Sequence, residues 1–119
     1  MTLNISSCNL LVLEKTIQTY KLWLEFYKHI DRKLRFSLVK KTDDLLFEII
    51  ELIFTAGISK IEEKQYYIEK SLAKLDILKL FLRILWETKA IDNKKYMNIS
   101  KPLNEIGKML GSWNKNLLK

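Results

Sequence analysis

The chain has 119 residues, of which 48% are hydrophobic, and it carries 21 lysines and arginines against 14 acids, for a formal net charge of +7. This length suits one domain, and the apolar fraction excludes a disordered chain because it supplies enough surface for a core. Three glycines and one proline are too few for an all-β protein, which needs a turn roughly every 8–12 residues. We therefore expect an all-α fold.

The first part of the chain predicts a lead-in and one helix. Residues 1–10 show no periodicity, so we expect a loose lead-in to a single domain over residues 11–119. A helix is predicted from about Leu11 to Ile30, because apolar residues recur there at helical spacing. Its expected buried face comprises Ile17, Tyr20, Leu24 and Tyr27, widened by Trp23 and Ile30.

A second helix is predicted from about Phe36 to Thr55. Its apolar residues Leu38, Leu45, Ile49, Leu52 and Ala56 are spaced for one face. Gly57 follows directly, and glycine is the residue that most easily adopts the left-handed conformation found after helices. We therefore expect Gly57 to cap the C-terminus of this helix.

The third predicted helix, from about Glu62 to Thr88, is the longest. One apolar face comprises Ile68, Leu72, Leu75, Leu82 and Leu85, and a second, offset face comprises Ile77, Phe81 and Ile84. A helix that is apolar around most of its girth is usually buried on more than one side. In a bundle this small, the second face predicts a subunit interface.

The last helix carries the most regular pattern. Apolar residues recur at steps of three and four from Tyr96 to Leu117, including Leu110 and Trp113. Asp92 suits the N-cap. Pro102 cannot donate a backbone hydrogen bond, so the helix either restarts near Ser100 or kinks there, and the unbroken stripe favours a kink. The four helices together predict an antiparallel up-down bundle with short loops.

Gly107 and Gly111 lie four residues apart, on one line of this last helix. A glycine inside a helix costs roughly 0.5–1 kcal/mol relative to alanine. Two aligned glycines therefore predict that another backbone comes close.

Catalytic and metal-binding patterns are not found in the sequence. A single cysteine, Cys8, excludes an internal disulfide, and a single histidine, His29, leaves no metal-ligand cluster. The acid pairs fall near predicted helix starts, where the helix dipole favours negative charge. We therefore expect a protein that is not an enzyme and has no cofactor. No secretory signal and no apolar run of about 18 residues is present, so we expect a cytoplasmic location and no membrane partner.

The charges are distributed in bands. Residues 28–41 hold six cations and one acid, residues 42–76 hold eight acids and four lysines, and residues 89–119 hold seven lysines and two acids. The first band brackets one loop, so its cations should share one end of the bundle. A solvated loop explains them as well as contact with nucleic-acid phosphates does. Lys108, Lys115 and Lys119 could extend the same field. Trp23, Trp86 and Trp113 lie on apolar stripes, which favours core or interface packing over base stacking.

Residues 105–113, Glu-Ile-Gly-Lys-Met-Leu-Gly-Ser-Trp, resemble the C-terminal segment of the accessory variability determinant (Avd) proteins of diversity-generating retroelements. Tyr20 with Trp23, the Arg35-Phe36 step and the Leu82-Arg83 step agree with this resemblance, which spans about residues 17–115. A wider group of four-helix proteins, encoded by ribosomal intervening sequences, usually carries an Asn-Ile-Ala-Glu-Gly motif after the second helix. This chain has Phe-Thr-Ala-Gly-Ile at residues 54–58 instead, which favours the retroelement branch.

The resemblance implies a four-helix bundle that assembles as a basic, pentameric ring-like barrel. It also implies binding to reverse transcriptase and to RNA and DNA, in support of mutagenic reverse transcription. The expected contacts for nucleic acid or polymerase are Lys28, Arg32, Lys33, Arg35, Lys40, Lys41 and Arg83. The residues expected in core packing or in the oligomer are Ile77, Phe81, Ile84, Gly107, Leu110, Gly111 and Trp113.

Two features leave alternatives open. Leu34 and Val39 stand near positions where the family often has proline and glycine, so the loop between the first two helices is expected to differ in shape. The alternative function is an oligomeric helical adaptor between proteins, which binds no nucleic acid and whose charge serves only solubility.

Overall fold

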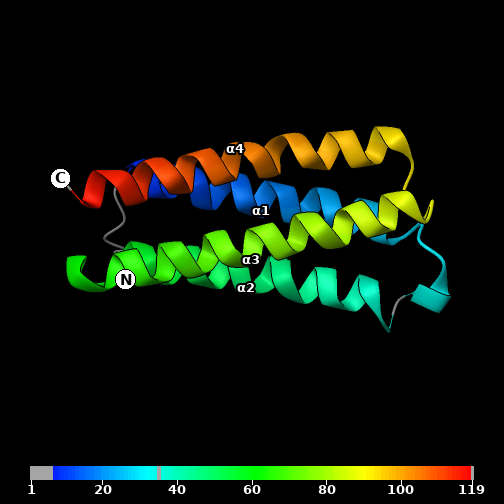
Figure 1. Cartoon of the computed structure of the whole chain (residues 1–119), viewed down its shortest axis with the longest axis horizontal. Helices are drawn as coiled ribbons and strands as arrows, with labels where there is room; N and C mark the ends of the chain where they lie inside the picture. Colours follow the sequence, from blue (N-terminus) through cyan, green and yellow to red (C-terminus); the bar gives the residue numbers. More distant parts are fainter. Residues whose placement is uncertain (1–6, 35, 119) are drawn as a thin grey trace.

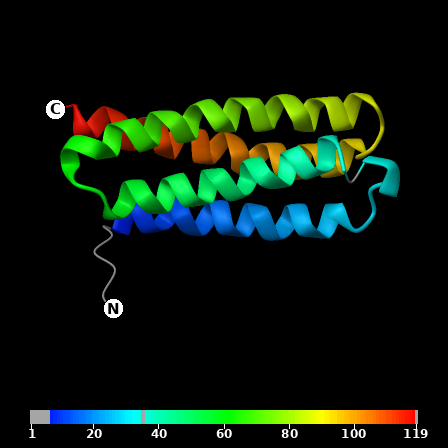
Figure 2. The ribbon, with the colours of Figure 1, turned by 90° about the horizontal axis from the view of Figure 1, so that it is seen from below.

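The structure, a computed structural model, describes residues 7–34 and 36–118, and these residues form helices and their connections. Four long helices follow in order: α1 (Ser7–Tyr27), α2 (Leu38–Ile58), α3 (Ile61–Glu87) and α4 (Asn93–Leu117). A single turn of 3-10 helix, η1 (Arg32–Leu34), lies between α1 and α2. The long helices run alternately up and down (Figures 1 and 2). The predicted all-α, four-helix bundle is therefore confirmed.

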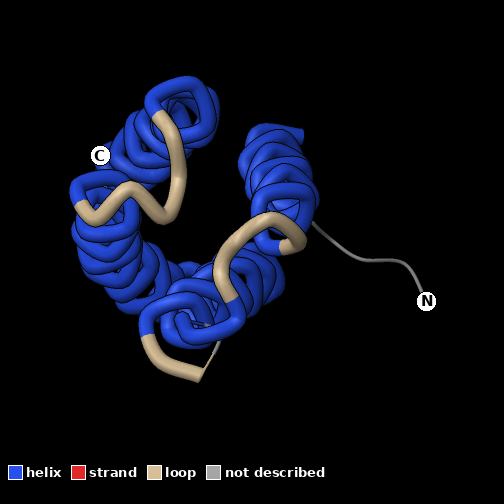
Figure 3. The backbone as a smooth tube through the Cα atoms, turned by 90° about the vertical axis from the view of Figure 1, so that its right-hand side faces the viewer, coloured by secondary structure: helices blue, strands red, loops and turns tan. Residues whose placement is uncertain are grey.

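The helices enclose one core. Viewed along the long axis, they stand around a common centre (Figure 3), where α1 packs on α2 and α4, and α3 packs on the same two helices. Each helix contributes fully buried apolar side chains, among them Trp23, Leu46, Ile49, Ile68, Leu78, Leu85, Ile99 and Leu110. The molecule measures 44 × 29 × 20 Å, and its length matches the rise of about 1.5 Å per residue over the 27 residues of α3.

The up-down order gives the bundle two distinct ends. The α1–α2 and α3–α4 connections lie at one end, on the right of Figure 1. The α2–α3 connection and the C-terminus lie at the other. Cations that are distant in sequence can therefore meet at the first end, and the C-terminal lysines cannot join them.

Helix α1 begins at Ser7, so residues 7–10 belong to the helix and not to the predicted lead-in. Leu10 and Leu11 are 45% and 62% exposed. Leu10 and Leu11 therefore do not belong to the buried face of α1. That is why no apolar periodicity marked this first turn. Residues 1–6 of the predicted lead-in lie outside the described residues.

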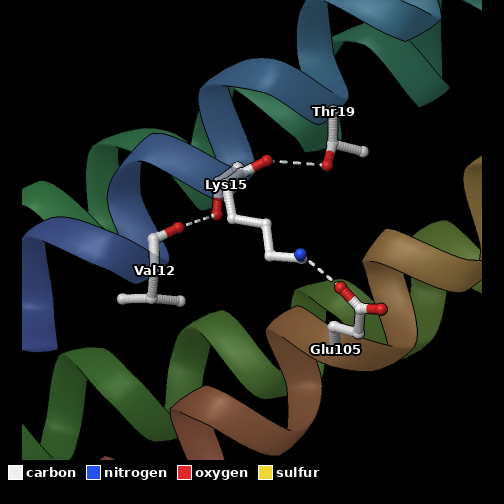
Figure 4. A network of polar contacts seen from close by, with 5 residues as sticks. Val12, Lys15, Thr19 and Glu105 are labelled. Atoms are coloured by element: carbon white, nitrogen blue, oxygen red, sulfur yellow. Dashed lines mark hydrogen bonds and ion pairs between the residues drawn. The ribbon is translucent and has the colours of Figure 1, made fainter.

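The buried face of α1 also differs from the predicted stripe. Trp23 and Phe26 are buried, whereas Leu24 is 39% exposed. Thr16 and Thr19 complete the buried face, because each hydroxyl donates to the backbone carbonyl four residues earlier, at 2.7 and 2.8 Å (Figure 4). A threonine that satisfies its own hydroxyl in this way can occupy an apolar face. The prediction counted only apolar residues, and it therefore placed the centre of the buried face of α1 at the wrong position around the helix.

Helix α2 continues past its predicted end. Gly57 lies inside the helix and is buried, and Ser59 is the C-cap, so the prediction of Gly57 as the cap is wrong. The ammonium group of Lys64, from α3, donates to the carbonyls of Ala56 at 2.8 Å and Gly57 at 3.0 Å. These two last-turn carbonyls thus have a donor without a left-handed glycine. Burial lowers the pKa of Lys64.

Helix α4 runs unbroken through Pro102, which excludes the alternative of a restart near Ser100. Asp92 is the N-cap, as predicted, and its carboxylate accepts a hydrogen bond from the Lys95 N–H at 2.8 Å. The predicted stripe faces the core: Ile99, Leu103, Ile106 and Leu110 are buried, and Tyr96, Trp113 and Leu117 pack against them from the two ends.

The two glycines of α4 do not face another backbone. A Cβ added to Gly107 would meet the Leu75 side chain at 3.3 Å, and one added to Gly111 would meet nothing within 4 Å. The predicted close approach of a second backbone is therefore wrong within this chain. Leu75 extends from α3 and fills the space beside Gly107.

Two ion pairs connect neighbouring helices. Lys15 of α1 pairs with Glu105 of α4 (Figure 4), and the hydrogen bond from Lys15 lowers the pKa of Glu105. Lys74 of α3 lies 2.8 Å from Glu48 of α2. All four side chains remain about a third or more exposed, so each pair contributes little stability.

Candidate nucleic-acid interface

Most of the lysines and arginines that were predicted to contact nucleic acid or polymerase lie within the described residues, and these lie at one end of the bundle. Lys28 follows α1, Arg32 and Lys33 form η1, Lys40 and Lys41 begin α2, and Arg83 lies one turn before the end of α3. All six side chains are exposed. Arg35 lies outside the described residues. We call this surface the basic end (Figure 1).

Three of these cations are close to acids that lie three or four residues away in the sequence. Lys28 lies 3.6 Å from Glu25, Lys40 lies 2.8 Å from Asp44, and Arg83 lies 2.6 Å from Glu87. The hydrogen bond to Asp44 raises the pKa of Lys40, and the one to Glu87 raises the pKa of Arg83. Arg32, Lys33 and Lys41 form no ion pair with the residues that the structure describes.

The fold adds three cations that sequence reasoning did not assign to this site. Lys89, Lys94 and Lys95 lie in the α3–α4 connection and the first turn of α4, at the same end of the bundle. Residues 28–41 and 83–95 together contain ten lysines and arginines against three acids. The up-down order was the signal that could have found them, since alternate loops of such a bundle share an end.

The C-terminal lysines lie elsewhere. Lys108 and Lys115 are on the second half of α4, toward the opposite end from the basic end (Figure 1). Their predicted extension of the same field is therefore wrong, because each pass of a helix reverses its direction along the bundle. Lys119 lies outside the described residues.

The turn after α3 presents Lys89 in an unusual conformation. Its φ is 65°, a left-handed value that glycine usually adopts at this position. The Lys89 N–H bonds the Trp86 carbonyl at 3.0 Å, and the Ala90 N–H bonds the Leu85 carbonyl at 2.8 Å. These are the two hydrogen bonds of a Schellman motif. A side chain other than glycine costs roughly 1–2 kcal/mol there, and the Lys89 side chain is exposed.

An aromatic pair lies beside this turn. The rings of Trp86 and Tyr96 stack with centroids 4.5 Å apart and planes 4° apart. Trp86 remains 37% exposed, and its Nε1–H donates to Asn93 Oδ1 at 2.6 Å. The sequence favoured a packed position for all three tryptophans, and Trp23 is fully buried. Trp86 instead lies at the surface of this chain, next to the buried Leu85.

A polar network fixes α1 to α2 below the basic end. Asp43 Oδ1 accepts hydrogen bonds from the Tyr20 hydroxyl at 3.0 Å and from Trp23 Nε1 at 3.2 Å. Burial, followed by the hydrogen bond to Asp43 and its charge, raises the pKa of Tyr20 to about 12. The network fixes the first turns of α2, which carry Lys40 and Lys41, to the second half of α1, which leads to Lys28.

We expect Tyr20 to make stability depend on alkaline pH. The neutral phenol is favoured in the folded state, so its contribution is fully present below its ordinary pKa of 10.0 and is lost as pH rises from there to about 12. Denaturant unfolding of the protein and of Tyr20→Phe, at matched pH values across this window, would measure it. The stability difference between the two should shrink as pH rises, and a constant difference would contradict the expectation.

A second surface feature is the outward side of α3. Ile77, Leu80 and Ile84 are 43%, 52% and 37% exposed and recur at steps of three and four, opposite the face that lines the core. Phe81 is half-buried beside them. Of the residues predicted for core or oligomer packing, Leu110 is therefore in the core, Trp113 packs at its edge, and Ile77 and Ile84 lie at the surface.

His29 is exposed in the cationic connection after α1. No group of three or more histidine, cysteine, aspartate or glutamate side chains in the described ranges is placed to hold a metal ion. Within the same ranges, no helix combines the length and the apolarity that crossing a membrane requires.

Fold and surface together define a small helical-bundle protein with a polarised, basic end. The sequence model of the bAvd-like family matches residues 10–117 of it, nearly the whole chain. The protein therefore belongs to the bAvd-like family, which confirms the resemblance to Avd proteins. No curated protein matches the sequence.

Proposed function

We propose that the protein is a non-enzymatic accessory component of a diversity-generating retroelement. It binds reverse transcriptase and RNA or DNA through the basic end, and so supports mutagenic reverse transcription. Membership of the bAvd-like family is the observation that carries this proposal. The gathering of exposed cations from two separate loops at one end supports it, because neutralised phosphates release counterions and provide affinity without base contacts.

Titration of labelled RNA at several salt concentrations tests the nucleic-acid part of this proposal. We expect binding at low salt. The logarithm of the association constant should fall linearly with the logarithm of the salt concentration, with a slope that is steeper by about 0.7 for each phosphate contacted on a single strand. A protein that binds no RNA at low salt would contradict it. Co-purification with the reverse transcriptase of such an element tests the polymerase part.

We further propose that copies of the chain pack through the outward side of α3 into a ring, with five copies as the resemblance implies. The exposed apolar row on α3 supports this proposal, because such a row is costly to leave in water and offers a ready seam for another helix. Repetition around a ring would give several basic ends to one nucleic acid, and linked weak contacts raise the overall affinity.

The double substitution Ile77→Glu and Leu80→Glu should lower the subunit number without unfolding the bundle. Both side chains are already exposed in the single chain, so charge there opposes association more than it opposes folding. Light scattering measures the mass and circular dichroism checks helicity. The matched control is Ile61→Glu with Met97→Glu, two residues that are 68% and 69% exposed and lie off the row. An unchanged mass in the first variant would refute this interface.

The same row favours a second candidate function, an oligomeric adaptor between proteins. In that case the row on α3 binds other proteins, and the cations serve only solubility. The salt titration separates the two functions, since the adaptor predicts no binding to RNA at low salt.

A further inference from the structure

The Trp86–Tyr96 stack is a preformed aromatic surface. The two rings come from different helices, the last turn of α3 and the first turn of α4, and they are parallel within 4°. The hydrogen bond from Trp86 Nε1 to Asn93 Oδ1 fixes the indole in its plane. The Schellman turn at Lys89 fixes the end of α3, and the two rings are already stacked in the protein without a ligand.

The two members of the stack differ in burial, because Tyr96 packs against the edge of the core whereas Trp86 lies at the surface. Trp86 is 37% exposed, whereas Trp23 has no exposed surface. Trp86 is thus more exposed than Trp23 and than the half-buried Trp113. The exposed part of Trp86 is available to extend the stack with a further planar group.

Cations flank the stack along α3, the connection and α4. Arg83 lies one turn before Trp86 on α3, Lys89 lies one turn after it, and Lys94 and Lys95 begin α4. Arg83, Lys89 and Lys94 are exposed. Aromatic rings next to cations are the combination that binds single-stranded nucleic acid, because bases stack on the rings while the cations follow the phosphates.

We propose that the Trp86–Tyr96 stack is a base-stacking site, which makes the basic end selective for single-stranded over double-stranded nucleic acid. This inference rests on the proposed function, since it names the form of nucleic acid that the basic end recognises. The faces of bases are exposed in a single strand and are covered by neighbouring bases in a duplex. A surface with cations alone would not distinguish the two by this means.

The test compares four labelled probes of equal length, about ten nucleotides: single-stranded RNA, single-stranded DNA, the same DNA backbone without bases, and a DNA duplex. All are measured with the whole protein at one salt concentration. We expect the single-stranded DNA to bind at least ~5-fold more tightly than the base-free backbone, because stacking is worth about 1–3 kcal/mol for each base. The RNA and DNA arms show whether the sugar affects the choice.

Variants locate the effect. Trp86→Leu keeps an apolar side chain but removes the aromatic face, so it should abolish the preference for bases while the salt dependence stays unchanged. Trp86→Phe should restore most of it, and Tyr96→Leu reaches the same stack from α4. The matched control is Tyr66→Leu, since Tyr66 is 60% exposed, has Lys70 5.6 Å from its ring centroid and lies on the first half of α3. It should change nothing.

Each outcome decides between the proposals. Equal binding of DNA and the base-free backbone by the unaltered protein overturns the stacking site and leaves phosphate binding in place. A preference for bases that persists in both Trp86→Leu and Tyr96→Leu also overturns it. No binding of any probe overturns nucleic-acid binding as a whole, and the stacking site with it. The comparison of probes needs no variant, so it decides even if Trp86→Leu fails to fold.

Discussion

Replacing Trp23 with alanine is expected to lower the free energy of unfolding by about 3–5 kcal/mol, the usual cost of removing a large buried aromatic side chain. Trp23 has no exposed surface and lies on the α1 side of the core. Its indole Nε1–H also donates to Asp43 at 3.2 Å, so the variant loses a hydrogen bond between α1 and α2 together with the packing. The total stability of a domain is about 5–15 kcal/mol, and this loss is a large part of it.

Denaturant unfolding followed by circular dichroism measures this change, at one fixed protein concentration because assembly would add to the apparent stability. Trp23→Phe is the first control: it keeps most of the ring and should cost less, and Tyr20 still donates to Asp43 at 3.0 Å. Trp113→Ala is the second: Trp113 is only half-buried, so its loss should destabilise less than Trp23→Ala. A loss below about 1 kcal/mol for Trp23→Ala would show that the core does not depend on this ring.

The helices could be predicted from the sequence where one residue type carries the signal. The stripe of α4 consists of large apolar residues at regular steps, and its central members, such as Leu103 and Ile106, are buried as expected. The buried face of α1 was displaced because Thr16 and Thr19 are polar by type but apolar in effect, once their hydroxyls bond to their own helix. Composition does not reveal whether a hydroxyl is satisfied locally.

Helix ends were harder to predict, because they depend on partners from other helices. Gly57 suits a C-cap by its own properties, but Lys64 of α3 supplies the donors for the last turn of α2. Lys89 shows the reverse case, a lysine in a left-handed conformation that its residue type does not favour. At Gly57 a partner from another helix overrides the local preference, whereas at Lys89 the hydrogen bonds to the end of α3 accompany the left-handed conformation.

Only the part of the candidate site around the α1–α2 connection could be predicted from the sequence. Residues 28–41 form a continuous band of cations, and their position at one end follows from the helices on either side. Lys89 and Lys94 lie some 50 residues further along, among other evenly spread lysines, and only the direction of each helix brings them to the same end. The same reasoning removes Lys108 from the site. The apolar spacing around Trp86 is typical of a packed side chain. Trp86 lies near the end of α3, however, and part of its side chain remains exposed.

Reversing three charges at the basic end should weaken nucleic-acid binding strongly. The variant combines Arg32→Glu, Lys41→Glu and Lys94→Glu, which lie on η1, α2 and α4. All three side chains are exposed and form no ion pair with the described residues, so helicity should be unchanged. We expect at least a ~10-fold loss of affinity at low salt and a salt slope smaller by about 0.7 for each single-strand phosphate that the variant no longer neutralises.

The matched control applies the same change of net charge away from the basic end, with Lys60→Glu, Lys108→Glu and Lys115→Glu. These exposed lysines lie in the α2–α3 connection and on the second half of α4. Overall charge steers nucleic acid toward a protein from a distance, so a modest loss in the control is expected, with the salt slope nearly unchanged. If both variants lost affinity equally, net charge alone would account for the binding, and the gathering of cations from two loops at one end would have no part in it. A larger loss in the first variant, with a reduced salt slope, would place the phosphate-binding residues at the basic end.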